Sequence, residues 1–109
     1  MRTKKPAPYN LDSKIRSALR KVWLWHPVRL KVKRTHTRCA ICDKWLGLGE
    51  KAIDHKEPAT PLDGMASWDE FITRLLKITE EDIQVLCKLC HKIKTAEENK
   101  ERRKRKKAK

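Results

Sequence analysis

Two C-x-x-C pairs of cysteines constrain this chain more than any other feature. The pairs are Cys39/Cys42 and Cys87/Cys90, with 44 residues between them. Together they can offer four thiolates to one tetrahedral ion at Zn–S distances of about 2.3 Å. Disulfides or free thiols are the alternatives, but the first residues, MRTKKP, lack the apolar core of a secretory signal, so we expect a reducing compartment. We therefore predict a structural Zn²⁺ site that ties two distant segments together.

Charge is distributed unevenly along the 109 residues, which have the size of one domain and a net charge of +14. Residues 1–38 carry twelve basic side chains and one acidic, and residues 100–109 carry eight and one, so the centre is slightly acidic. Basic ends around an acidic centre are typical of a protein that grips a polyanion at its periphery. No stretch approaches the ~20 apolar residues of a membrane span, so we expect a nucleic-acid partner and no membrane.

The N-terminal third is predicted to form three parts. Residues 1–10 contain two prolines and no apolar period, which indicates a flexible basic arm. Residues 11–36 are predicted to be a basic helix followed by an extended segment. Apolar residues recur at helical spacing up to the proline at position 27, and Asp12 or Ser13 can cap the helix. Beyond that proline, partial alternation over 28–38 favours a short strand or extended basic segment.

The remaining elements are predicted around the two cysteine pairs. The predicted elements are a strand over residues 51–55, a loop over 56–66, a helix over 68–76, a strand over 83–86, and a helix from 88 through 98 that frays into a basic tail, 100–109. The third of these begins with the capping box S-W-D-E at Ser67. Its aromatic residues suit a core better than a binding surface.

Asp54, His55 and His91 lie beside the cysteine pairs and could form a catalytic centre. A carboxylate and an imidazole can hold a divalent ion while leaving positions for water and phosphate oxygens. If Asp54 and His91 bind the ion, His55 is free to take a proton from water. A D-H dipeptide alone occurs by chance, but its position between two cysteine pairs favours the functional interpretation.

These residues stand within a longer pattern. Residues 52–58 (AIDHKEP) and 82–95 (DIQVLCKLCHKIKT) closely resemble the HNH endonuclease family, and most of all its small phage-type members with four zinc-binding cysteines. The resemblance covers about residues 37–98, it implies an HNH nuclease domain at residues 37–99, and the basic ends lie outside it. It implies an α+β fold: a ββα-metal (His-Me finger) core stapled by a four-cysteine zinc site, with an added N-terminal helix and basic terminal arms.

By the same resemblance, His55 is the general base, Asp54 and His91 bind the catalytic ion, and the four cysteines bind structural zinc. The implied catalytic ion is Mg²⁺ or Mn²⁺, with Ni²⁺, Co²⁺ or Zn²⁺ also compatible with an imidazole ligand. The products would carry 5′-phosphate and 3′-hydroxyl ends. Asp82 departs from the family, which usually has an asparagine that braces the loop of the general base. An ionised aspartate accepts such hydrogen bonds but cannot donate them, so Asp82, as a second candidate catalytic residue, could weaken the brace or act as an extra carboxylate near the metal.

Basic residues of both ends are predicted to contact DNA phosphates without reading bases. The candidates are Lys14, Arg16, Arg20, Lys21, Arg29, Lys31, Lys33, Arg34, Lys94, Arg102, Arg103, Lys104 and Arg105. A solvated helix face, or for the tail a nuclear localisation signal, is the alternative interpretation.

The sequence therefore predicts a metal-dependent endonuclease acting on double-stranded DNA. A non-catalytic zinc module that binds nucleic acid remains the main alternative, and a protein-interaction module, which would not explain the charge, remains a weaker one. By analogy with phage-type members we expect the cytoplasm of a bacterial host cell. A homodimer and a phage packaging partner both remain open.

Overall fold

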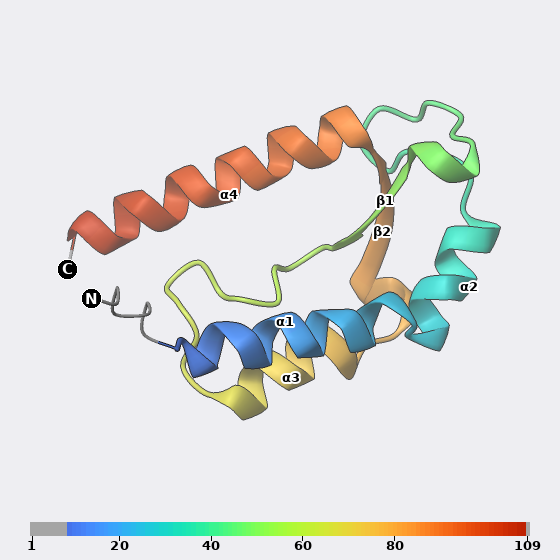
Figure 1. Ribbon diagram of the computed structural model, residues 1–109. Coiled ribbons are helices and arrows are strands. Elements are labelled where there is room, and N and C mark those ends of the chain that lie inside the picture. The colour runs from blue at the N-terminus through green and yellow to red at the C-terminus, as the bar shows by residue number, and fades with distance from the viewer. Residues whose placement is uncertain (1–8, 109) are drawn as a thin grey trace, which may run out of the picture.

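The structure is a computed structural model that describes residues 9–108, so residues 1–8 of the predicted arm and Lys109 lie outside it. Within the described range, helices combine with one small sheet in a mixed α+β architecture (Figure 1). The elements are α1 (Leu11–Leu24), α2 (Pro27–Thr35), the 3-10 turn η1 (Leu48–Glu50), β1 (Lys51–His55), α3 (Trp68–Leu76), the 3-10 turn η2 (Glu80–Asp82), β2 (Ile83–Cys87) and α4 (Lys88–Ala108).

The two strands form an antiparallel sheet at one end of the molecule. Lys51 pairs with Cys87, and His55 pairs with Ile83. Both predicted strands are confirmed, and the second is one residue longer than expected. Two short strands are marginal alone, so the sheet depends on the helices that contact it. Because β2 continues directly into α4, the second cysteine pair lies at the strand–helix junction.

The core lies between the sheet, α1, α2 and α3. Phe71 of α3 is fully buried, and Leu75 of the same helix and Trp23 of α1 are nearly so. The predicted helix α3 is confirmed with its cap: the Ser67 hydroxyl accepts a hydrogen bond from the backbone N–H of Glu70 at 3.1 Å. Its strongly amphipathic pattern explains why this helix was predictable from sequence.

The predicted first helix is confirmed, but its predicted cap is wrong. Asn10, rather than Asp12 or Ser13, caps α1, since its Oδ1 accepts a hydrogen bond from the backbone N–H of Ser13 at 3.0 Å. The helix therefore begins earlier than either candidate cap would allow. Leu11 and Val22 of the apolar stripe remain exposed. Only part of the stripe thus joins the core.

The short strand or extended segment predicted over residues 28–38 is wrong, because most of that stretch forms α2. The proline at the first position of α2 has a φ suited to a helix, and the Nδ1 of His26 accepts a hydrogen bond from the N–H of Val28 at 3.1 Å. Val28 and Val32 are four residues apart, so helical spacing fits them as well as alternation does. Tertiary packing settles the choice, because Val32 is completely buried.

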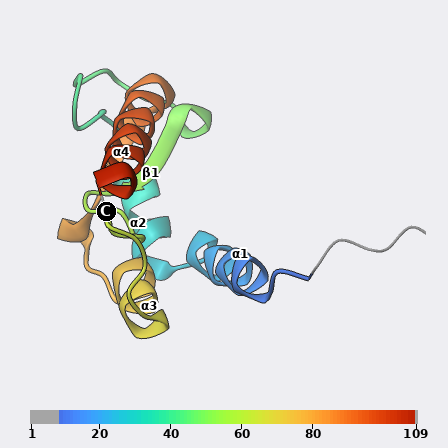
Figure 2. The same ribbon diagram turned by 90° about the vertical axis from the view of Figure 1, so that its left-hand side faces the viewer.

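The last helix is longer than predicted. We expected α4 to extend through Glu98 and then fray, yet it continues to Ala108 and includes most of the predicted tail. Figures 1 and 2 show α4 projecting from the sheet along the side of the loop that follows β1. Most of the C-terminal basic residues are therefore held at helical spacing rather than on a loose chain.

The helical assignment of residues 27–35 can be tested by comparing two apolar positions. In a strand, Val32 and Leu30 would share one face, whereas in α2 Val32 is 0% exposed and Leu30 is 37% exposed. We expect Val32→Ala to lower the free energy of unfolding by about 2–3 kcal/mol and Leu30→Ala by less than about 1 kcal/mol. Denaturant unfolding of the zinc-loaded protein measures both. Equal losses would contradict the helix.

Candidate functional site

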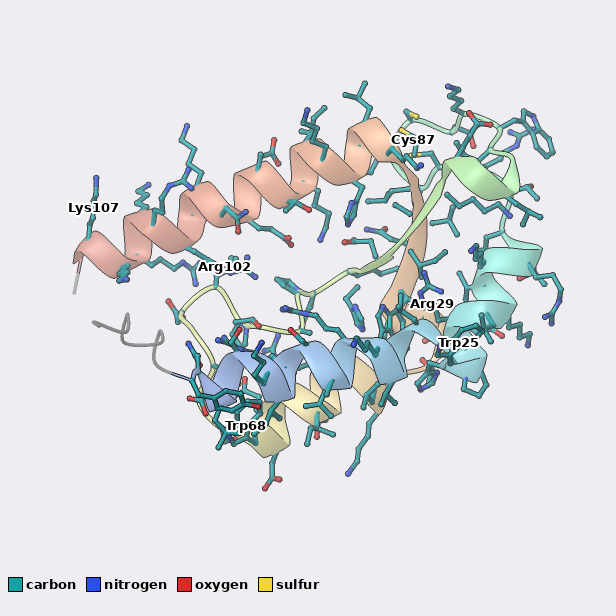
Figure 3. The ribbon with its side chains drawn as sticks, in the orientation of Figure 1. Trp25, Arg29, Trp68, Cys87, Arg102 and Lys107 are labelled. Atoms are coloured by element: carbon teal, nitrogen blue, oxygen red, sulfur yellow. The ribbon has the colours of Figure 1, made fainter. Side chains whose placement is uncertain are left out.

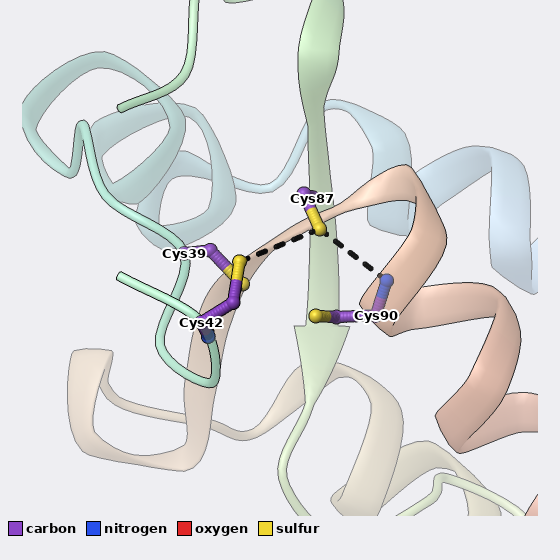
Figure 4. Close-up of side chains that lie close together, drawn as sticks. All are labelled: Cys39, Cys42, Cys87 and Cys90. Atoms are coloured by element: carbon purple, nitrogen blue, oxygen red, sulfur yellow. Dashed lines mark hydrogen bonds between the residues drawn. The ribbon is translucent and has the colours of Figure 1, made fainter. Parts of the chain in front are cut away.

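The four cysteines converge as predicted. Cys39 and Cys42 belong to the turn before η1, Cys87 ends β2, and Cys90 lies in the first turn of α4 (Figure 4). All four Sγ atoms lie within 4.8 Å of one another, and those of Cys42 and Cys87 are 3.9 Å apart. A tetrahedral zinc site with bonds of about 2.3 Å separates its sulfurs by about 3.8 Å. All four thiols are free, so this cluster can hold a structural metal such as zinc.

In each cysteine pair, the backbone of the second cysteine donates a hydrogen bond to the sulfur of the first. The backbone N–H of Cys42 donates to Cys39 Sγ at 3.4 Å, and that of Cys90 donates to Cys87 Sγ at 3.3 Å. Burial raises the pKa of Cys39, but backbone hydrogen bonds, first that of Cys42, outweigh it and bring the pKa to about 6. The hydrogen bond to Cys87, helped by burial, raises the pKa of Cys90 to about 12. The backbone hydrogen bonds thus favour the thiolate of Cys39, the form in which a cysteine binds a metal.

The second predicted site lies beside this cluster, where β1 faces α4. Asp54 is only 8% exposed, although it is a carboxylate. Its Oδ2 accepts hydrogen bonds from Gln84 Nε2 at 3.0 Å and from Lys94 Nζ at 3.1 Å. Its Oδ1 lies 3.8 Å from His91 Nε2. One carboxylate oxygen is therefore held by the protein, while the other faces the imidazole.

Lys94 connects the polar residues around Asp54. Besides its hydrogen bond to Asp54, its Nζ lies 2.7 Å from Glu98 Oε2 and 3.2 Å from the main-chain oxygen of His55. Burial lowers the pKa of Lys94, but the hydrogen bonds to Glu98 and Asp54 outweigh that effect, so the pKa is raised overall. The ammonium predicted to contact DNA is thus already bound by two carboxylates.

His55 is held by contacts from two helices. Its Nε2 lies 3.0 Å from the main-chain oxygen of Leu75, and its ring lies 4.3 Å from that of Trp23, centroid to centroid. A carbonyl oxygen only accepts, so Nε2 carries the proton, and in the neutral ring Nδ1 is the basic nitrogen. Burial lowers the pKa of His55, and the hydrogen bond to Leu75 only partly opposes it. Burial therefore favours the neutral form of the imidazole.

A cleft of about 360 Å³ brings the three predicted residues together. Asp54 and His55 line it from β1, and His91 lines it from α4. Arg20 of α1 and Arg102 of α4 border it from different helices. It is a concave, polar site in which imidazoles and a carboxylate face the same space.

Asp82 does not join that cleft. Its Oδ2 accepts hydrogen bonds from the N–H and hydroxyl of Thr79, at 2.8 and 3.2 Å. Its main-chain oxygen accepts the N–H of Lys56 at 3.0 Å, beside His55. The side chain borders a neighbouring cleft of about 310 Å³, which His55 also lines. The carboxylate thus caps η2, while the main chain holds the residue after the predicted base.

The predicted DNA-contacting residues differ in the contacts that their side chains make. The side chains of one group make hydrogen bonds or ion pairs within the described chain: Arg29, Lys31, Lys94, Arg102 and Arg105. Arg20 lies over the Phe71 ring at 5.9 Å. The side chains of a further group are exposed or half-buried and have no such partners in the part of the chain that the structure describes: Lys14, Arg16, Lys21, Lys33, Arg34, Arg103 and Lys104.

Sequence reasoning missed three residues of the site. Gln84 is paired with Asp54 in the strand register, and its polarity within an apolar strand was a usable signal. The Lys94–Glu98 spacing of four residues was also visible as a helical ion pair. Trp23 gave no signal, because only the packing of α1 brings it to His55.

No protein-family model matches this chain, and no curated protein or solved structure matches it significantly. Among the described residues, no helix is both long enough and apolar enough to cross a membrane.

The cysteine cluster predicts a dependence of the fold on metal. We expect Cys87→Ser to lose the bound zinc and to unfold the domain, because the junction of β2 and α4 loses its link to the Cys39 turn. Zinc content and thermal unfolding of the purified protein measure this. The control is Ala40→Ser, which changes an exposed residue between Cys39 and Cys42 and keeps all four thiols. An unchanged melting temperature in Cys87→Ser would rule the prediction out.

We expect two lysines of α4, Lys94 and Lys92, to contribute differently to the free energy of unfolding. Replacing Lys94 with methionine leaves Asp54 buried with fewer partners, so we expect the free energy of unfolding to fall by about 1–3 kcal/mol. Lys92→Met, at an exposed position of the same helix, should change it by less than about 0.5 kcal/mol. Chemical denaturation of the zinc-loaded proteins provides the comparison. Two equal midpoints would show that Lys94 does not stabilise Asp54.

Proposed function

We propose that this chain is a metal-dependent DNA endonuclease of the HNH type that hydrolyses phosphodiester bonds. One observation carries the proposal: Asp54 and His91 face each other across 3.8 Å in the same cleft that His55 lines. The resemblance of the surrounding motifs to the HNH family supports the same assignment, and so does the net charge of +14.

The donor set of Asp54 and His91 suits a divalent ion. Two donors about 2.1 Å from one ion are separated by about 3.0 Å when adjacent and by at most about 4.2 Å when opposite. The 3.8 Å between Asp54 Oδ1 and His91 Nε2 is longer than the adjacent spacing, so the two side chains would approach by about 0.8 Å to bind one ion as adjacent ligands. Mg²⁺ or Mn²⁺ would stabilise negative charge on the phosphate and the leaving oxygen. Two protein ligands leave the other positions to water and substrate.

His55 is proposed as the general base. Its Nε2 proton is engaged by the Leu75 carbonyl, so only Nδ1 can accept a proton from water. The lowered pKa keeps this nitrogen unprotonated near neutral pH. Contact with Trp23 and Leu75 fixes the ring before substrate arrives, which reduces the reorganisation that catalysis would otherwise need.

Asp82 does not argue against catalysis. In the HNH family the equivalent asparagine is thought to brace the loop of the general base. Here the main-chain oxygen of Asp82 accepts the Lys56 N–H, and a main-chain bond does not depend on the side chain at position 82. We propose that this bond replaces the family's brace, with the Asp82 carboxylate engaged in capping η2.

Cleavage of supercoiled plasmid at low salt tests the proposal. We expect the zinc-loaded protein to nick or linearise plasmid when Mg²⁺, Mn²⁺ or Ni²⁺ is added, and His55→Ala to lose about 100-fold or more of that rate. His36→Ala, which changes an exposed histidine outside the cleft, should retain it. An arm with EDTA establishes the requirement for metal.

Each outcome of this assay decides between the two candidate functions. Metal-dependent cleavage that is lost in His55→Ala supports the nuclease, and the ratio of nicked to linear product shows whether one strand or both are cut. Plasmid that is shifted in a gel but uncut with every metal would contradict the nuclease. It would favour a nucleic-acid-binding module that keeps the zinc site.

A further inference from the structure

The C-terminal half of α4 has two chemically different faces. Toward the loop after β1, its side chains are partly buried and paired: Arg102 and Arg105 contact loop residues. On the other side, Arg103 and Lys104 are exposed and make no side-chain hydrogen bond or ion pair within the described chain. Figure 3 shows Arg102 on the side of α4 that faces the loop, whereas Lys107 points away from it.

Arg102 joins α4 to the loop through a main-chain contact. Its Nη2 donates to the Thr60 oxygen at 2.8 Å, while its Nη1 donates to Asn99 Oδ1 at 2.9 Å. One turn further, Arg105 Nη1 lies 3.2 Å from Asp63 Oδ1. The planar guanidinium of Arg102 is thus fixed on its own helix and presents its second nitrogen to the loop.

The loop is held from the opposite side as well. Arg74 of α3 donates to the Pro58 oxygen at 3.2 Å. Pro58 and Thr60 line the cleft together with Asp54 and His55, and Arg102 borders the same space. The segment directly after the proposed base therefore spans from α3 to α4, with an arginine at each end. It has no regular secondary structure of its own, so its position depends on such contacts.

We propose that Arg102 is a positioning residue of the cleft, which holds the loop after His55 in place through Thr60, while Arg103 and Lys104 on the outer face bind nucleic-acid phosphates. This inference rests on the proposed nuclease function. It divides the predicted DNA-binding cluster of residues 102–105 into a positioning face and a binding face. The neighbouring arginines 102 and 103 then have different tasks, although a loss of either removes the same charge.

Arg102→Ala and Arg103→Ala form the matched pair that tests this. Affinity is measured by fluorescence anisotropy with a duplex oligonucleotide over a salt titration, without an activating metal. Cleavage of the bound complex is measured in single turnover with saturating protein and Mn²⁺. We expect Arg103→Ala to weaken binding at least as much as Arg102→Ala and to reduce the salt slope by about one. Arg102→Ala should slow bound-state cleavage about tenfold or more relative to Arg103→Ala.

A second readout does not need cleavage. Hydrogen–deuterium exchange over residues 56–66 should accelerate in Arg102→Ala and stay slow in Arg103→Ala, with Arg102→Lys in between, because an ammonium cannot reproduce the two-nitrogen contact. If the native chain does not cut DNA, the proposed nuclease fails and the exchange data alone decide whether Arg102 fixes the loop. Equal loop exchange in both alanine variants, or equal bound-state rates, would overturn the proposal. Unchanged zinc content and helicity control for misfolding.

Discussion

The convergence of four sulfurs within 4.8 Å is the constraint on which the rest of the structure depends. It links the turn at Cys39 to the junction between β2 and α4, two segments that are far apart in the sequence. A two-stranded sheet of this size cannot hold such a junction by itself. The cluster therefore fixes the direction in which α4 leaves the sheet. Because His91 directly follows Cys90, that direction also brings its imidazole to Asp54 on β1.

The polar residues next to the cysteine cluster compensate the buried charge of Asp54. Asp54 is almost fully buried, and an isolated carboxylate there would be costly. Lys94 and Gln84 bind Oδ2, and Glu98 in turn binds Lys94. These contacts leave Oδ1 as the oxygen that faces His91. The same ammonium that stabilises Asp54 must, however, repel a divalent ion nearby. In the proposed nuclease Lys94 therefore favours a defined ligand geometry at some cost in metal affinity.

The sequence predicted the features whose signals are local. The cysteine pairs, the strand at 51–55 and the amphipathic helix α3 carry their own spacing or pattern, and all are confirmed. The strand predicted within 28–38 is wrong. The valines at positions 28 and 32 fit both strand alternation and helical spacing, so the sequence alone does not separate the two structures. Only the burial of α2 against the sheet decides for the helix. The contact of Trp23 with His55 joins residues 32 positions apart and depends on the packing of α1, which no local pattern encodes.

The continuity of α4 adds geometry that a flexible tail would lack. A run of lysines and arginines predicts only a charged surface, but an α-helix rises about 1.5 Å per residue. Arg103 therefore lies about 18 Å along α4 from His91. Since a DNA strand advances about 3.4 Å per base pair, that distance can span at most about five base pairs. Under the proposed function, α4 thus acts as a spacer between His91 and the phosphate contacts of its outer face, and its two faces keep loop positioning and DNA binding apart.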